Sequence, residues 1–336
     1  KECPTRDGPC FLQGARERAD KAQILVVNHA LLLSDASSGG GLLPKSSCLV
    51  IDEAHKLDEQ ATKQYGVSLG QDEIELHVQR TMGRRGIGHE AVEAYRTSTS
   101  AGDRLNNTRS VNERYASSLA KVKENLETLF GLASRFASEF TERQNSELRE
   151  FRITDSLRAQ PLWSEIEIAW ENLDGGLGHL DKYTNDLLDS LSGLEANKLL
   201  GYEQLKAAIG DYRDVNTQHR ATLRDFFTEP DELFVYWMSE GNRGGMVLNT
   251  APLDVGGILK ETLFDKKSSV VLTGATLSAS GSFASFHKKL GIETTKEISL
   301  GSPFDYKRIL LCIAQDMPEP GSKDYDLRLA SAISQL

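Results

Sequence analysis

The sequence predicts an α/β fold that is interrupted by a large all-helical insertion, and three observations predict it. Short apolar runs, Cys48 to Ile51 and Ser269 to Leu272, are typical of strands buried on both faces of a parallel sheet. Between these runs, apolar residues recur at helical spacing over long stretches. Between Pro44 and Pro230 the only proline is Pro161, and this scarcity of proline also favours long helices.

The bulk composition bounds the class of protein. The chain has 336 residues, of which 39% are hydrophobic and 26% charged, as expected of a globular protein with two compact units. No run of eighteen apolar residues occurs, and the start at Lys1 lacks the profile of a signal peptide, so we expect a cytoplasmic fragment. A net charge of −10 argues against a generally basic, nucleic-acid-coating surface, although it leaves room for a local groove.

Residues 1–71 are expected to form part of the α/β unit. Ile24 to Val27 is predicted to be a buried strand that ends in the polar pair Asn28-His29. The run that ends at Ile51 is followed by Asp-Glu-Ala-His. Ligands of parallel sheets bind at the carboxyl ends of the strands, and both polar clusters fall there.

Residues 72–228 are expected to form an all-helical domain. Three apolar stripes at spacings of mostly three, four or seven residues predict its core: Leu119, Val122, Leu126, Leu129, Phe136 and Phe140; Leu177, Leu180, Tyr183, Leu187, Leu191 and Leu194; Tyr202, Leu205, Ile209, Tyr212, Asn216, His219, Leu223 and Phe226. Trp163, Trp170 and the pair Phe226-Phe227 could stack on DNA bases, but core packing is the stronger interpretation.

From residue 229 the β character returns, and residues 229–300 are expected to rejoin the first α/β unit. Phe234 to Met238 and Gly245 to Leu248 flank a glycine-containing turn and predict a hairpin. The strand that ends at Leu272 leads into Thr-Gly-Ala-Thr-Leu. Residues 301–336 are expected to begin a further unit, with a strand over Ile309 to Ile313 and a helix at the end of the chain.

Two polar clusters could support chemistry. Asp52 at the end of a strand could hold Mg²⁺ through water, the adjacent Glu53 could take a proton from an attacking water, and His55 could sense that site. Thr273 and Thr276 could bond to the histidine from the neighbouring strand. The alternatives are a surface loop for the acids and a helix N-cap for Thr276.

Two glycine-rich segments resemble phosphate-binding loops only superficially. Gly39 to Ser46 places Pro44 where such a loop requires glycine and does not open a helix, so a plain loop is predicted. Gly83 to Gly88 has the wrong glycine spacing and no preceding strand. Arg84 and Arg85 within it are predicted to be solvated charges and not contacts to a DNA backbone.

Five segments in order resemble the DinG/XPD family of superfamily-two DNA helicases. They are ILVVNHALLL, LVIDEAH, APLDV, VVLTGATL with Phe283 to Gly291 after it, and GSPFDY, covering about 22–62 and 233–320. The resemblance implies a partial RecA-like motor domain, an arch-type helical insertion and the start of a second motor domain. It also implies an ATP-dependent DNA helicase in DNA repair or replication that moves 5′ to 3′ on single-stranded DNA. We further expect no membrane contact and a monomer.

The resemblance assigns roles to matched positions. Asp52 and Glu53 would be the Mg²⁺ and water-activating acids, and His55 with Thr273 and Thr276 would couple ATP hydrolysis to DNA. The family usually has serine where this chain has Gly274, so one hydroxyl of that coupling network is missing.

Cysteines near the start of the chain match a cofactor position of the family. Cys3 and Cys10 stand where it places the last ligands of a 4Fe-4S cluster, which takes four thiolates. Cys48 and Cys312 lie in apolar runs and are predicted to be buried core cysteines. A cluster would therefore need two ligands from beyond Lys1, and two ordinary thiols are the alternative. The scattered positions of these four cysteines favour a reducing compartment.

Other functions remain open. A non-catalytic DNA-binding or protein-interaction module built on the helical insertion is the main alternative, and the intact Asp52-Glu53 pair argues against it. A nuclease would need a carboxylate cluster that the sequence does not supply. Because no glycine-rich phosphate loop is present, this chain alone is expected to neither bind ATP tightly nor hydrolyse it.

Overall fold

A computed structural model describes the parts of the chain that are treated below. They are residues 10–82, 86–96, 102–144, 150–191, 202–241, 244–293, 295–301, 305, 307, 310–311, 313–314 and 317–335. The chain divides into two units, Lys1–Glu293 and Thr294–Leu336, and each is described by itself.

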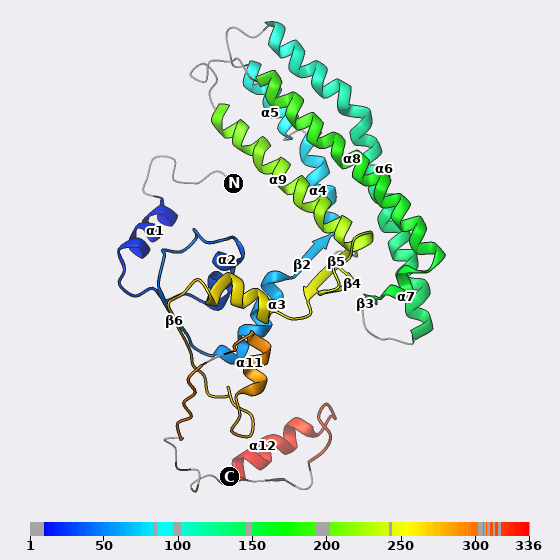
Figure 1. Ribbon diagram of the computed structural model, residues 1–336. Helices are drawn as coiled ribbons and strands as arrows, with labels where there is room; N and C mark the ends of the chain where they lie inside the picture. Colours follow the sequence, from blue (N-terminus) through cyan, green and yellow to red (C-terminus); the bar gives the residue numbers. More distant parts are fainter. Residues whose placement is uncertain are drawn as a thin grey trace. The chain divides into compact units, whose positions relative to one another are not determined.

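The first unit contains most of the secondary structure (Figure 1). Its helices are α1 (Phe11–Lys21), α2 (His29–Ser37), the 3₁₀ turn η1 (Ala54–Lys56), α3 (Leu57–Tyr65), α4 (Gln71–Met82), α5 (Ile87–Arg96), α6 (Gly102–Gln144), α7 (Asp155–Arg158), α8 (Pro161–Leu191), α9 (Tyr202–Phe227), α10 (Gly256–Leu259), the π-helical turn η3 (Lys260–Phe264) and α11 (Ala284–Leu290). Its strands are β1 (Cys48–Ile51), β2 (Val67–Gly70), β3 (Glu150–Ile153), β4 (Phe234–Glu240), β5 (Met246–Pro252) and β6 (Ser269–Leu272).

Two separate sheets organise these strands. β1 and β6 pair in parallel, with Ile51 opposite Leu272 at their carboxyl ends. The other sheet is antiparallel in the order β2-β5-β4-β3. The expected parallel pairing of the two motif-bearing strands is therefore confirmed, and the elements from η1 to η3 lie between them in sequence.

We call α4 to α9 together with the four-stranded sheet the helical body. α6, α8 and α9 lie side by side in it, as Figure 1 shows. The predicted stripes are its core wherever they are described: every position is buried except the partly buried Tyr202 and Phe140, and Leu194 lies outside the described residues. Trp163 and Trp170 are buried as well, which confirms the core interpretation.

The helix α8 continues without a break through Gly175-Gly176, just before the stripe that starts at Leu177. A Cβ on Gly176 would come within 2.8 Å of Val122 Cγ2 of α6, so this glycine lets two long helices approach closely. Pro161 stands at the first position of α8, where its missing N–H costs no hydrogen bond.

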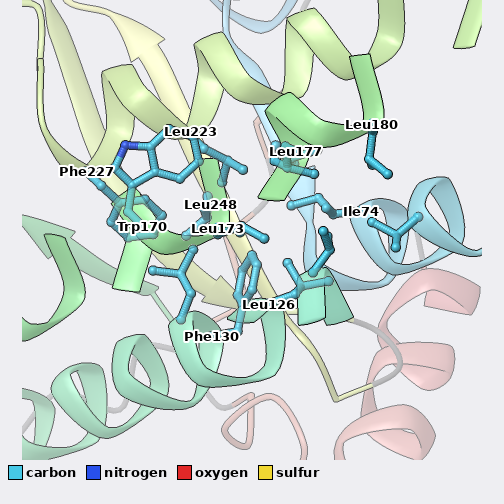
Figure 2. Close-up of a cluster of buried hydrophobic side chains, with 14 of the residues drawn as sticks. Ile74, Leu126, Phe130, Trp170, Leu173, Leu177, Leu180, Leu223, Phe227 and Leu248 are labelled. Atoms are coloured by element: carbon cyan, nitrogen blue, oxygen red, sulfur yellow. The ribbon is translucent and has the colours of Figure 1, made fainter. Parts of the chain in front are cut away.

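The hairpin β4–β5 belongs to the helical body. It pairs with β2 and β3, and Leu248 of β5 lies among helical side chains such as Leu173 and Phe130 (Figure 2). The hairpin therefore lies in the antiparallel sheet and not in the β1–β6 sheet. The expected all-helical character of 72–228 is wrong at β3, because Phe151 and Ile153 alternate into the core while β3 pairs with β4.

We call α2, β1, η1, α3, α10, η3, β6 and α11 the strand-pair region. Its core is small and centres on Leu33, Ile51, Leu57 and Leu259. The predicted strand over Ile24 to Val27 is absent. Ile24 and Val26 are 82% and 89% exposed, because no described strand pairs with this segment and only Val27 packs against the core.

The predicted burial of the strand pair on both faces is also wrong. Val50 and Val271, paired across β1 and β6, are 66% and 50% exposed, and Cys48 is exposed instead of buried. Among the described residues the sheet has two strands and part of each face is exposed to solvent, so the apolar sequence of β1 and β6 predicts more burial than the structure shows.

The second unit contains α12 (Tyr325–Gln335), which confirms the helix expected at the end of the chain. The strand expected over 309–313 is not seen at the described positions Leu310, Leu311 and Ile313, which belong to no helix or strand and are exposed. Within the described part of the chain, no helix combines the length and the apolarity needed to cross a bilayer.

Candidate active site

The two predicted motif loops meet at one edge of the parallel sheet. The backbone N–H of Thr273 donates to Ile51 O at 2.9 Å, and the N–H of Ala54 donates to Thr273 O at 3.0 Å. Each strand thereby passes directly into a loop that is hydrogen-bonded to the other loop. This is the carboxyl edge at which parallel sheets bind ligands.

The acidic pair lies in the open at this edge. Asp52 is exposed, and the Glu53 side chain is 56% exposed. The buried Ala54, which follows them, anchors the loop in the core of the strand-pair region. The two carboxylates are therefore free to meet a solvated ligand while their backbone is fixed.

His55 faces the neighbouring acid. Its Nδ1 lies 3.2 Å from Glu53 Oε2, although the geometry does not make a hydrogen bond and this buried nitrogen has no other partner among the described residues. We therefore regard the pair as a close contact and not as a hydrogen bond.

A third element reaches the same loop from α2. His29 Nε2 lies 2.9 Å from the backbone carbonyl of Asp52, within hydrogen-bond distance. The Asn28 side chain accepts from Leu31 N at 2.9 Å and so caps the helix on which His29 stands. The polar pair Asn28-His29 therefore lies at the site although the strand expected before it does not form.

The hydroxyl residues lie on the second loop. Thr273 and Thr276 are exposed, and the contacts between their loop and that of His55 run through the backbone bonds described above. Thr276 does not cap a helix, since α11 begins only at Ala284, whose N–H donates to Ser282 Oγ. A Cβ on Gly274 would lie 3.1 Å from Leu277 Cδ2 and 3.5 Å from Ala54 N, so this position is tight.

The glycine-rich segment before β1 is a loop, as predicted. Asp35 Oδ1 accepts from the N–H groups of Leu42 and Leu43, at 2.8 and 3.0 Å. A phosphate-binding loop offers such amides to its ligand. Here a carboxylate already occupies them, which is a second reason, besides Pro44, that this segment is no phosphate cradle.

The acids suit a hydrated Mg²⁺, which typically takes one or two carboxylates together with waters and phosphate oxygens. Across the residues that the structure covers, no three or more His, Cys, Asp or Glu side chains form a metal-binding group. Of the predicted cluster ligands, Cys10 is partly exposed at the N-cap of α1, and Cys3 lies outside the described residues, as do Cys312, Arg84 and Arg85. The described thiols do not supply the four ligands of an iron–sulfur cluster.

Two residues outside the named catalytic set have contacts of note: His29 lies at this edge, and Asp35 lies in the loop region before β1. The signal for His29 was available, because a polar pair directly follows an apolar run. Asp35 gives no such signal, since only the folded loop brings its carboxylate to amides seven and eight residues ahead.

Comparison with known proteins finds helicase-named relatives over nearly the whole chain. The sequence is 29% identical over 329 residues to an "ATP-dependent DNA helicase YoaA" of Escherichia coli, covering 96% of this chain and 44% of the relative. It is 24% identical over 319 residues to a "3'-5' exonuclease DinG" of Bacillus subtilis, covering 91% of this chain and 33% of the relative. No family model matches the chain.

A shorter and closer match concerns 16% of the chain. Over 53 residues it is 45% identical to an "ATP-dependent helicase DinG" of Mycobacterium tuberculosis, of which it covers 8%. The chain spans less than half of the length of the curated relatives it matches.

Proposed function

The chain belongs to the DinG-type family of helicases, and on that premise we propose that the protein containing it is an ATP-dependent DNA helicase that acts on single-stranded DNA. The observation that supports this most directly is the meeting of the two motif loops at one sheet edge with Asp52 and Glu53 exposed there. Movement 5′ to 3′ and a role in DNA repair or replication rest on the family resemblance, as do a monomeric state and a cytoplasmic location.

The proposed architecture follows the same resemblance. The strand-pair region would be part of a RecA-like motor domain, and the helical body would be its arch-type insertion. This is supported by the parallel β1–β6 pair, whose two strands lie on either side of the helical body in sequence. The hairpin β4–β5 would then be part of the insertion.

The chemistry follows from what each residue can do at this edge. Bound Mg-ATP would supply the phosphoryl group and neutralise part of the charge that develops during hydrolysis. Asp52 would hold the hydrated cation through a water, and Glu53 would accept a proton from the attacking water. His55, 3.2 Å from the Glu53 carboxylate, would orient that carboxylate and, with Thr273 and Thr276, relay the state of the site toward DNA.

A direct test measures phosphate release by the full-length protein with single-stranded DNA, duplex DNA or no DNA. We expect single-stranded DNA to stimulate hydrolysis, and Asp52→Asn to abolish the stimulated rate because the amide holds the cation poorly. Strand displacement should require a 5′ overhang.

The alternative function is a non-catalytic DNA-binding or interaction module built on the helical body. DNA binding without any ATP hydrolysis by the wild-type protein would favour that alternative and would refute the proposed enzyme. The name of the Bacillus subtilis relative raises a nuclease, for which the described residues offer no carboxylate cluster.

The iron–sulfur cluster remains a prediction of the resemblance. If Cys3 and Cys10 are ligands, the full-length protein purified without oxygen should be brown and contain iron, and Cys10→Ser should bleach it. Cys48→Ser, at an exposed thiol on β1, is the matched control and should keep the colour. A colourless, iron-free anaerobic preparation would refute the cluster.

A further inference from the structure

Glu53 adopts a backbone conformation that residues other than glycine rarely take. Its φ and ψ are 51° and 39°, in the left-handed region. The neighbouring acid does not share it, since the described non-glycine residues with positive φ are Glu53 and Ser280. Such a conformation persists where surrounding groups hold it, and it is often found where a side chain must be aimed.

The peptide groups on both sides of Glu53 are held by hydrogen bonds. On the preceding side, the Asp52 carbonyl faces His29 Nε2 at 2.9 Å. On the following side, the Ala54 N–H donates to Thr273 O at 3.0 Å. The His29 contact comes from a side chain, so it is the one that a substitution can remove without changing the backbone.

His29 stands on a fixed support. It begins α2, whose Leu32, Leu33 and Ala36 are buried in the core of the strand-pair region. The Asn28 cap closes the first turn of the same helix. A rigid helix therefore presents the imidazole to the loop, and little conformational freedom is lost when the bond forms.

We propose that His29 is a positioning residue that aims Glu53 for ATP hydrolysis by fixing the peptide group before it. This inference rests on the proposed function. Because the partner is a carbonyl oxygen, which only accepts, Nε2 must carry the proton and donate. His29 acts on the backbone of Glu53, whereas His55 faces its carboxylate, so the two histidines hold different parts of one residue.

The experiment compares three variants of the full-length protein. His29→Phe keeps a ring of similar size but removes the donor. His29→Gln offers an amide N–H at a similar reach. His179→Phe makes the same change on an exposed histidine of α8 and serves as the control.

We expect His29→Phe to lower kcat for DNA-stimulated ATP hydrolysis about tenfold, the upper end of the effect of losing one hydrogen bond, with KM for ATP nearly unchanged. His29→Gln should recover most of the rate, and His179→Phe should match wild type. A merely structural role would instead lower the active fraction of Phe and Gln variants alike. Equal losses in these two variants, or no loss in either, would overturn the proposal.

A spectroscopic measurement separates this inference from the proposed function. ¹⁵N NMR of the imidazoles, assigned by comparison with His29→Gln, should show His29 Nε2 as a protonated nitrogen at pH 8, whether or not the protein hydrolyses ATP. If the wild-type protein has no ATPase activity, the proposed function fails, and the NMR signal still tests the contact because an unprotonated Nε2 could not donate to the carbonyl. An unprotonated Nε2 would overturn the role of His29 by itself.

Discussion

The helical body and the strand-pair region bury their side chains to very different extents. In the helical body, predicted stripes are almost completely buried, and its Arg220 pairs with Asp174 at 2.6 Å and with Asp181 at 2.7 Å. In the strand-pair region, by contrast, Val50 and Val271 stay largely exposed and the acids face solvent.

The two regions are therefore expected to contribute differently, the helical body to the stability of the fold and the strand-pair region to the candidate site. Long helices with wide apolar stripes bury each other's side chains, and strand residues such as Leu248 complete the same core, so the helical body carries most of the apolar core. The strand-pair region has a smaller core that mainly fixes two loops. Substitutions in the first region should therefore act on the free energy of unfolding, and substitutions at the loops should act on turnover.

The largest stability effect is expected at Trp163. Its side chain is fully buried, packs edge-on against Phe136, and donates from Nε1 to Phe227 O at 3.3 Å. Trp163→Ala should lower the free energy of unfolding by about 3–5 kcal/mol through lost burial and the cavity left behind. Chemical denaturation measures this loss. Ile168→Ala, at a 60% exposed position of α8, is the control and should change it by less than about 0.5 kcal/mol.

A second effect concerns pH and the buried His77 of α4. Burial and the nearby His219 lower its pKa from 6.5 to about 4, while its Nε2 lies 3.3 Å from Asn216 Oδ1 and its ring stacks on Tyr212. The unfolded chain binds the proton near pH 6.5 and the folded chain resists it. Stability is thus full above about pH 6.5 and falls by on the order of 3 kcal/mol as the pH drops to about 4.

Other charged residues lie near His77 and His219 and affect the pKa values of both histidines. Arg80 further lowers the pKa of His77, and Glu73, 3.6 Å from His219 Nε2, partly offsets the lowering of the pKa of His219 by burial. His77→Phe keeps the stacking on Tyr212 but cannot titrate, so it should flatten the pH dependence of unfolding between pH 7 and 4. An unchanged slope in this variant would show that His77 is not its source.

A smaller effect is expected at Gly291, within the strand-pair region. It ends α11 with φ 67°, and a Cβ there would lie 2.5 Å from Gly256 O. Gly291→Ala should lower the free energy of unfolding of the strand-pair region by about 2 kcal/mol, from left-handed strain and overpacking together. Gly257→Ala, whose Cβ would meet open space, is the control. Similar Tm values for the two variants would mean that the close approach is not required.

The same contrast explains what the sequence could predict. The apolar stripe of α9 could be recognised in the sequence because its residues face one core. The helical spacing of these residues is a local pattern and is visible without knowing their partners. β3 was missed because Glu150 to Ile153 is a four-residue alternation whose meaning comes only from its pairing with β4, distant in the sequence. The hairpin β4–β5 was predicted, but its partners β2 and β3 were not, since partner choice is a long-range property.

The candidate site could be predicted for those residues that directly follow a predicted strand. Asp52, Glu53 and Thr273 follow apolar runs, and the parallel pairing of those runs brings them to one edge. The polar pair after an apolar run marks His29 as a candidate, but the identity of its partner and the left-handed backbone of Glu53 carry no sequence signal, because both depend on how two loops and a helix are held together in the fold.

The central claim is that Glu53 is the base for ATP hydrolysis, and Glu53→Gln in the full-length protein tests it most directly. The amide keeps the shape of the side chain but cannot accept the proton of the attacking water. We predict that kcat falls by about 100-fold or more, while the dissociation constant of Mg-ATP and the Tm stay close to those of wild type. Turnover within a few-fold of the wild-type rate would contradict the account.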